Sequence, residues 1–171
     1  MIFGLDLSLT STGISWEEKA ITIPTKLRGA ERLRWIGLEI VKIVDKESTD
    51  GWAHAVIEGY SFAQRQSRAH AIGELGGVVK VALLDNGIPF SIVPPTVRAK
   101  FATGKGNAAK SAVVSAVSAR TGLVFDNDDQ CDAWILAEMG RHQILGEGQF
   151  EWPQINMKAL EKAEWNVPSP K

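Results

Sequence analysis

The sequence of 171 residues contains one cysteine and one tyrosine, carries a formal net charge of only -1, and has no long apolar run. Cys131 cannot form an internal disulfide and lacks the partners of a cysteine-rich zinc site. No window reaches the roughly 18 uninterrupted apolar residues that a membrane span requires. The N-terminus has no basic region, and Asp6 interrupts its apolar run too early for a signal peptide. We therefore expect a soluble, cytoplasmic protein without membrane association.

The composition is that of an ordinary globular protein. Apolar residues make up 44% of the chain and charged residues 23%, which excludes a disordered, collagen-like or disulfide-rich protein. A domain of about this length buries roughly two thirds of its unfolded surface and needs no cross-links. We expect one domain over residues 1–145. The remainder, 146–171, has three prolines and little periodicity, and we expect a tail that forms no separate domain.

Hydrophobic periodicity predicts an α/β fold. Short apolar or alternating runs indicate strands at 2–7, 13–16, 20–23, 53–58 and 90–93. The first three follow one another so closely that they predict an antiparallel meander, whereas a helix precedes the fourth and favours a parallel crossover. Helical patterns cover 26–46, about 69–85, 96–101, 108–120 and 128–144. This order predicts a five-stranded mixed sheet with helices on both faces.

Positive charge is concentrated in the middle of the chain. Residues 62–120 carry eight Lys and Arg against two acids, whereas acids exceed bases on both sides of this stretch. Such a distribution is typical of a surface that faces phosphate groups. The alternative is that charges separated along the sequence mix again in space.

Four acids stand in unusual positions. Asp6 lies within an apolar strand, Glu58 ends another, and Asp129 and Asp132 are three residues apart at the start of a helix, on one face. A buried carboxylate must be paired, protonated or bound to metal. Ordinary explanations are a strand end, an arginine partner, or a helix cap or first-turn acid among residues 126–129. No basic residue lies close in sequence to Asp6 or Glu58.

Taken together, the four acids favour a metal site. Clustered carboxylates repel one another, and oxygen donors select Mg²⁺ or Mn²⁺ rather than zinc. Two such ions about 4 Å apart can activate water and stabilise the leaving oxygen in phosphodiester cleavage. A structure that places Asp6, Glu58 and Asp132 far apart, or that ties any of them to an arginine instead, would overturn this interpretation.

The motifs that hold these acids resemble a known family. Gly4-Leu5-Asp6 with Thr12-Gly13, Val56-Ile57-Glu58, Gly73-Glu74-Leu75-Gly76-Gly77, the loop 104–111 and Asp129-x-x-Asp132-Ala133 resemble the RuvC family of Holliday junction resolvases, of the RNase H-like superfamily. The resemblance covers about residues 2–145. Leu7-Ser8 replaces the Pro-Gly that usually follows the first acid in bacterial members, so the chain looks more like a phage-encoded member, acting in the host cytoplasm.

The resemblance implies an RNase H-like fold, a homodimer and an endonuclease that nicks four-way DNA junctions. It implies two Mg²⁺ ions, for which Mn²⁺ can substitute, held by the catalytic residues Asp6, Glu58, Asp129 and Asp132. It also implies DNA contacts from Lys105 and Lys110, from an aromatic residue that is either Tyr60 or Phe62, and from Arg65 and Arg68. Gly104 and Gly106 would let the backbone approach a phosphate.

Glycines in the second predicted helix bear on assembly. Gly73, Gly76 and Gly77 are poor helix formers, and in the resembled family this helix contributes to the dimer interface. Close packing of the helix on its own sheet is the alternative.

Three other functions remain open. A RuvC-like nuclease could cut forks, flaps or replication intermediates without preferring four-way junctions. The Gly4–Gly13 segment also resembles the phosphate loop of actin-like and sugar-kinase ATPases, but 171 residues leave room for only one of their two lobes, so we expect no nucleotide cofactor. A non-catalytic DNA-binding module would not need the four acids.

Overall fold

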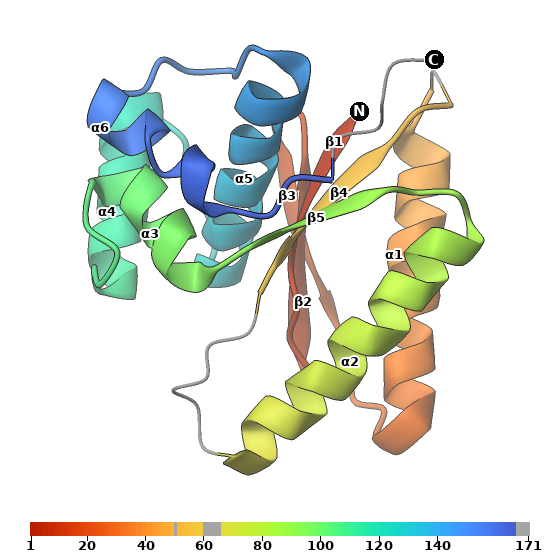
Figure 1. The fold of residues 1–171 in the computed structure, drawn as a ribbon. Coiled ribbons are helices and arrows are strands. Elements are labelled where there is room, and N and C mark those ends of the chain that lie inside the picture. The colour runs from red at the N-terminus through yellow and green to blue at the C-terminus, as the bar shows by residue number, and fades with distance from the viewer. Residues whose placement is uncertain (50, 60–65, 167–171) are drawn as a thin grey trace.

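The computed structural model describes residues 1–49, 51–59 and 66–166, and the side chains of all of these except 66–69. Its first half contains β1 (Ile2–Asp6), β2 (Ser11–Trp16), β3 (Lys19–Pro24), α1 (Gly29–Glu47), β4 (His54–Glu58), α2 (Gln66–Asp85) and β5 (Phe90–Val93). Its second half contains α3 (Pro95–Thr103), α4 (Lys110–Thr121), α5 (Asp128–Gly140), a π-helical turn η1 (Arg141–Leu145), α6 (Gln154–Met157) and a 3₁₀ turn η2 (Leu160–Lys162) (Figure 1).

The five strands form one mixed sheet in the order β3-β2-β1-β4-β5. The β1, β2 and β3 strands pair antiparallel, whereas β4 runs parallel to both β1 and β5. The predicted meander and parallel crossover are therefore confirmed. Because β1, β4 and β5 are parallel, their carboxyl ends meet at one end of the sheet, and Leu5 and Ile57 are register partners there.

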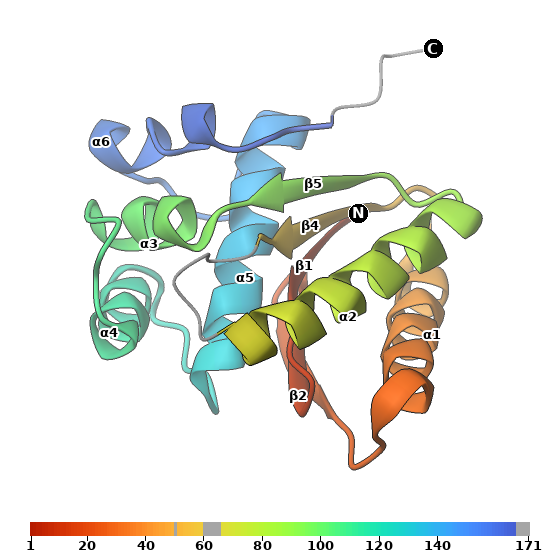
Figure 2. The ribbon, with the colours of Figure 1, turned by 60° about the horizontal axis from the view of Figure 1, so that its bottom comes forward.

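Helices cover both faces of the sheet, as expected. The pair α1 and α2 lies on one face, and α5 lies on the other with α3, α4 and α6 beyond it (Figures 1 and 2). Alternating strand residues divide between two cores: Leu5 and Ile57 pack with the α1 and α2 side, whereas Val56 packs with Trp134 on the α5 side. Alternation along buried strands thus separates the two layers.

Glycine lets α5 lie directly on the sheet. A Cβ atom on Gly13 would lie 2.2 Å from the carbonyl oxygen of Asp129, so no other residue fits β2 at this position without displacing the helix. Asn127 directly precedes α5, and its side chain caps the helix by accepting a hydrogen bond of 3.0 Å from the backbone N–H of Gln130. Asp128 and Asp129 are first-turn acids, one of the ordinary roles expected for residues 126–129.

The last long helix is shorter than predicted. The α-helical part of the predicted 128–144 helix ends at Gly140, and the chain continues as the π-helical turn up to Leu145. Glu138 is fully buried and accepts hydrogen bonds from the backbone N–H groups of Gln149 (3.0 Å) and Phe150 (2.9 Å) and from Arg141 Nε (2.8 Å). This carboxylate therefore ties the end of α5 to the segment that follows it.

The segment after residue 145 is packed against the rest of the chain up to residue 166. Trp152 and Leu160 are buried in the core that lies around α3 and α5, and Glu164 forms an antiparallel bridge with Ile92 of β5. The short α6 and η2 elements were not predicted, because four- and three-residue helices leave no periodic pattern. None of the helices that the structure describes is long and apolar enough to cross a membrane.

Candidate active site

Three elements bring the four predicted acids to the carboxyl end of the parallel strands. Asp6 ends β1, Glu58 ends β4, and Asp129 and Asp132 lie in the first two turns of α5. We call these four residues the acidic cluster. The close contact of β2 with the start of α5 at Gly13 places the helix pair beside the strand ends.

The acids of the cluster influence one another's protonation. Burial, followed by repulsion from Glu58 and Asp132, raises the pKa of Asp6 well above its ordinary value. Burial likewise raises the pKa of Asp132 to about 6, with Glu58 adding to the shift. Burial and the neighbouring Asp128 raise the pKa of Asp129, against a hydrogen bond from Ser11 that lowers it. The carboxyl groups are therefore close enough to repel one another.

An arginine that the sequence did not assign to the site lies among them. Arg98 extends from α3, is 6% exposed, and pairs with two members of the cluster. Its Nε lies 2.5 Å from Glu58 Oε1, and its Nη1 donates a hydrogen bond to Asp132 Oδ1. Burial lowers the pKa of Arg98, but Glu58 and Asp132 outweigh burial and raise it.

This pairing gives Glu58 and Asp132 a basic partner from a distant part of the sequence. Arg98 was counted only within the basic stretch, because it lies 40 residues from Glu58 and 34 from Asp132 in sequence. The fold brings them together because α3 follows β5, whose end lies beside that of β4, with Val93 as the register partner of Glu58. For Glu58 and Asp132, the alternative of an arginine partner is therefore realised in this structure.

The carboxylate oxygens of the acidic cluster suit a metal ion chemically, whereas their positions in this structure do not. Oxygen donors that are buried and mutually repelling suit a hard divalent cation. Among the described residues, however, no three His, Cys, Asp or Glu side chains lie close enough to hold one. With Arg98 taking an oxygen each from Glu58 and Asp132, the predicted metal site is not formed in this arrangement.

The two predicted DNA-binding lysines occupy different settings. Lys105 is exposed in the loop between α3 and α4. Lys110, at the start of α4, pairs with Asp128 in the first turn of α5 and so lies next to the acidic cluster. Burial lowers the pKa of Lys110, but the hydrogen bond to Asp128 and the charges of Asp128, Asp132 and Asp6 together outweigh burial and raise the pKa.

The glycines of this loop have explanations within the chain. Gly104 ends α3 in the left-handed conformation, with φ of 79°. A Cβ on Gly106 would lie 3.0 Å from the carbonyl oxygen of Thr96. The glycine spacing, which we interpreted as room for a phosphate, is thus already required by the helix end and by the packing of the loop on α3.

Several basic side chains of the 62–120 stretch make contacts within the chain. Arg98 and Lys110 pair with acids, and Arg120 lies over the ring of Trp152, with 5.1 Å between Cζ and the ring centroid. Of the other predicted DNA-contacting residues, Tyr60, Phe62 and Arg65 lie outside the described residues, as does the side chain of Arg68.

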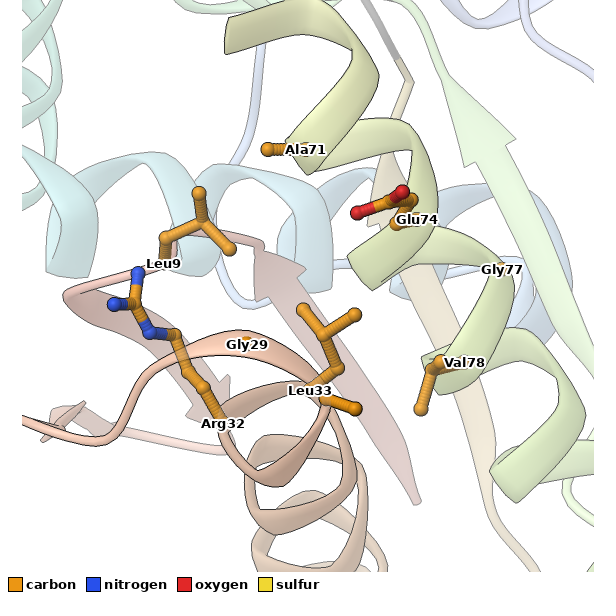
Figure 3. A pocket seen from close by; sticks show the side chains of 9 residues that line it. Leu9, Gly29, Arg32, Leu33, Ala71, Glu74, Gly77 and Val78 are labelled. Atoms are coloured by element: carbon orange, nitrogen blue, oxygen red, sulfur yellow. The ribbon is translucent and has the colours of Figure 1, made fainter.

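A groove of about 670 Å³ separates α1 from α2 near the β1–β2 turn (Figure 3). Its lining consists of Leu9, Gly29, Ala30, Arg32, Leu33, Ala71, Glu74, Gly77 and Val78. Added Cβ atoms at Gly73 and Gly77 would meet nothing within 4 Å. For these two glycines, close packing of α2 on its own sheet is therefore not the explanation.

The sheet is RNase H-like, and four acids lie at the carboxyl ends of its parallel strands and on the helix beside them. This fold and this placement of acids indicate a protein of the nuclease class. The structure resembles that of Thermus thermophilus RuvC, with a TM-score of 0.67 and 20% identity over 88% of this chain and 99% of that one. It also resembles T. thermophilus RuvC in complex with a Holliday junction substrate (TM-score 0.63, 22% identity, 80% of this chain and 89% of that one).

Sequence comparison defines the family. The chain is 30% identical over 119 residues to the crossover junction endodeoxyribonuclease RuvC of Brachyspira hyodysenteriae, an alignment that covers 68% of this chain and 72% of that protein. No family model matches the chain. The chain belongs to the RuvC family, which is divalent-metal dependent.

Proposed function

We propose that the chain is a Holliday junction resolvase, a metal-dependent endonuclease that nicks four-way DNA junctions. The observation that carries the proposal is the convergence of Asp6, Glu58, Asp129 and Asp132 at one end of the sheet in a member of the RuvC family. The relatives are named for crossover junction cleavage or were solved with a junction. We also propose that the protein acts in the cytoplasm, which is that of the host if the chain is phage-encoded.

The acidic cluster provides the catalytic residues. We propose that Asp6, buried at the centre of the cluster, and Glu58, Asp129 and Asp132 around it hold two Mg²⁺ ions, with Mn²⁺ as a substitute. Bound there, the ions would supply an activated water and neutralise the leaving oxygen. The buried carboxyls must lose their protons before they bind a cation, and the raised pKa values of Asp6 and Asp132 make this step pH-dependent.

Basic residues beside the cluster would position the DNA backbone. Lys105 is exposed, and Lys110 lies close enough to the cluster for Asp6 and Asp132 to influence its pKa. We propose phosphate contacts for both lysines and for Arg65 and Arg68. Either Tyr60 or Phe62 would stack on unpaired bases at the junction centre.

The exposed side of α2 would form a homodimer. Added Cβ atoms on Gly73 and Gly77 would meet nothing within 4 Å, and Val81 and Leu84 are 57% and 61% exposed further along the same helix. Residues four apart share a helix face, so these positions form one smooth apolar stripe. Sedimentation of the wild type against Leu84→Glu at micromolar concentration tests this proposal: a wild-type monomer would contradict it.

A substrate panel tests the function. The purified chain is incubated with a four-way junction, a fork, a flap and linear duplex of matched sequence, with Mg²⁺ or with EDTA, alongside Asp6→Asn. We expect Mg²⁺-dependent nicks in the junction, and junction binding without cutting by Asp6→Asn. Equal cleavage of all branched DNAs would support the broader nuclease, whereas equal cleavage of linear duplex would exclude structure selectivity.

A further inference from the structure

Arg98 occupies the position of a counter-ion in the acidic cluster. Acids from β1, β4 and α5 face its guanidinium: Asp6, Glu58 and Asp132 all raise its pKa. The side chain of Arg98 is 8% exposed, and those of its two direct partners, Glu58 and Asp132, are 17% and 3% exposed. One buried positive charge therefore stands opposite several acids that repel one another.

The same carboxylate oxygens cannot serve Arg98 and a metal ion in this arrangement. Arg98 uses two separate donors, Nε for Glu58 and Nη1 for Asp132, and so holds the acids of β4 and α5 around a guanidinium. Among the described residues, no three potential ligands converge on one point while these pairs are made. A cation held jointly by Glu58 and Asp132 would need Arg98 to release at least one of them.

We infer that Arg98 is an internal counter-ion that holds Glu58 and Asp132 together in the metal-free protein and exchanges with the incoming divalent cation. Arg98 is a positioning residue under this inference, because it acts through the two acids. The inference rests on the proposed metal-dependent function. It implies that Arg98 stabilises the metal-free protein and weakens metal binding, since a cation held jointly by Glu58 and Asp132 must displace it.

Thermal unfolding of Arg98→Met and Arg98→Lys, in EDTA and across a Mg²⁺ titration, tests the inference. We expect Arg98→Met to lower the Tm in EDTA, because it leaves buried carboxylates without a partner, and Arg98→Lys to restore part of the loss. The Mg²⁺ concentration that raises the Tm by a given amount should fall at least about fivefold in Arg98→Met, since an opposing positive charge is gone. An unchanged or higher Mg²⁺ concentration for the same rise would overturn the inference.

A measurement on the wild type does not depend on whether the variants fold. The Nε–H signal of Arg98 in a nitrogen–proton NMR spectrum should move during a titration with Mg²⁺ alone and stop moving when Mg²⁺ saturates the protein. Arg141 provides the matched control, because its Nε also donates to a buried acid, Glu138, away from the cluster. An Arg98 signal that stays in place while Mg²⁺ saturates the protein would overturn the inference.

The two proposals fail in different ways. If the wild type neither binds Mg²⁺ nor cuts any DNA of the panel, the proposed function fails. If it binds Mg²⁺ and cuts the junction while Arg98 is unaffected by the metal, only the role of Arg98 fails.

Discussion

A Cβ atom on Gly4 would lie 1.9 Å from the carbonyl oxygen of Ala133, so β1 and α5 are in direct backbone contact. Gly4 lies two residues before Asp6 and Ala133 directly follows Asp132, so this contact limits how far apart the two acids can be. We expect Gly4→Ala to lower the free energy of unfolding by about 2–4 kcal/mol, in the range of overpacking and backbone shifts, and to reduce cleavage.

The matched control for this substitution is Gly37→Ala. The new Cβ would make ordinary contacts there, the nearest 3.5 Å from Ala82 Cβ. Since alanine is the better helix former, the control should be neutral or stabilise the protein by up to about 1 kcal/mol. Urea unfolding of both variants measures the difference, and equal effects would contradict the close packing of β1 on α5.

The raised pKa of Asp132 predicts how metal-free stability changes with pH. An acid whose pKa is higher in the folded than in the unfolded protein binds more protons when folded, so its contribution to stability falls as pH rises. For Asp132, with a pKa of about 6 against an ordinary value of 3.8, the fall extends from about pH 4 to pH 7.

Asp132→Asn removes this contribution. In EDTA, the difference in unfolding free energy between the variant and the wild type should shift by about 1–3 kcal/mol in favour of the variant as the pH rises from about 4.5 to 7.5. Urea unfolding at several pH values measures it. A difference that stays constant, or that favours the wild type as pH rises, would show that burial does not raise the pKa of Asp132.

Lys105 should contribute one phosphate contact to junction binding. Lys105→Ala should weaken binding by a similar factor for every junction sequence and reduce the slope of log affinity against log salt by about 0.9. Lys110→Ala should change the slope less, because Lys110 is already paired with Asp128. Lys42→Ala, which removes a lysine paired with Glu39 on α1, is the control and should leave the slope unchanged. An unchanged slope in Lys105→Ala would remove this residue from the DNA interface.

Glu138 should stabilise the segment that follows α5. Glu138→Gln keeps the shape but weakens the bonds from Arg141, Gln149 and Phe150, and we expect a loss of about 1–3 kcal/mol in unfolding free energy. Glu39→Gln, which breaks an exposed ion pair with Lys42, should cost less than about 0.5 kcal/mol. Similar losses in the two variants would show that the buried hydrogen bonds of Glu138 contribute little.

Much of the fold was predictable because its signals are local. Short apolar or alternating runs identified all five strands, and the helix between the third and fourth strands indicated the parallel crossover. The capping of α5 by Asn127 could also have been read from the sequence, as an Asn followed three residues later by Gln130. The π-helical turn after Gly140 has no such local signal.

The acidic cluster was predictable because strand ends and helix spacing place its members. The partner of Glu58 and Asp132 was not, since Arg98 comes from a helix whose direction depends on how the chain leaves β5. The packing of Trp152 and the buried role of Glu138 were missed for the same reason: both depend on contacts between elements. Long-range pairing of charges is a property of the folded chain.

Single-turnover cleavage of a four-way junction by four single variants tests the acidic cluster most directly. Asp6→Asn, Glu58→Gln, Asp129→Asn and Asp132→Asn are compared with Asp126→Asn, which changes an acid that bonds Gln130 at the start of α5. We predict that each cluster variant binds the junction and cuts it at least about 100-fold more slowly in Mg²⁺, the scale of losing a catalytic group. Asp126→Asn should stay within about threefold of the wild type. A cluster variant that cuts at the wild-type rate, or an equal loss in Asp126→Asn, would contradict the assignment of these four carboxylates.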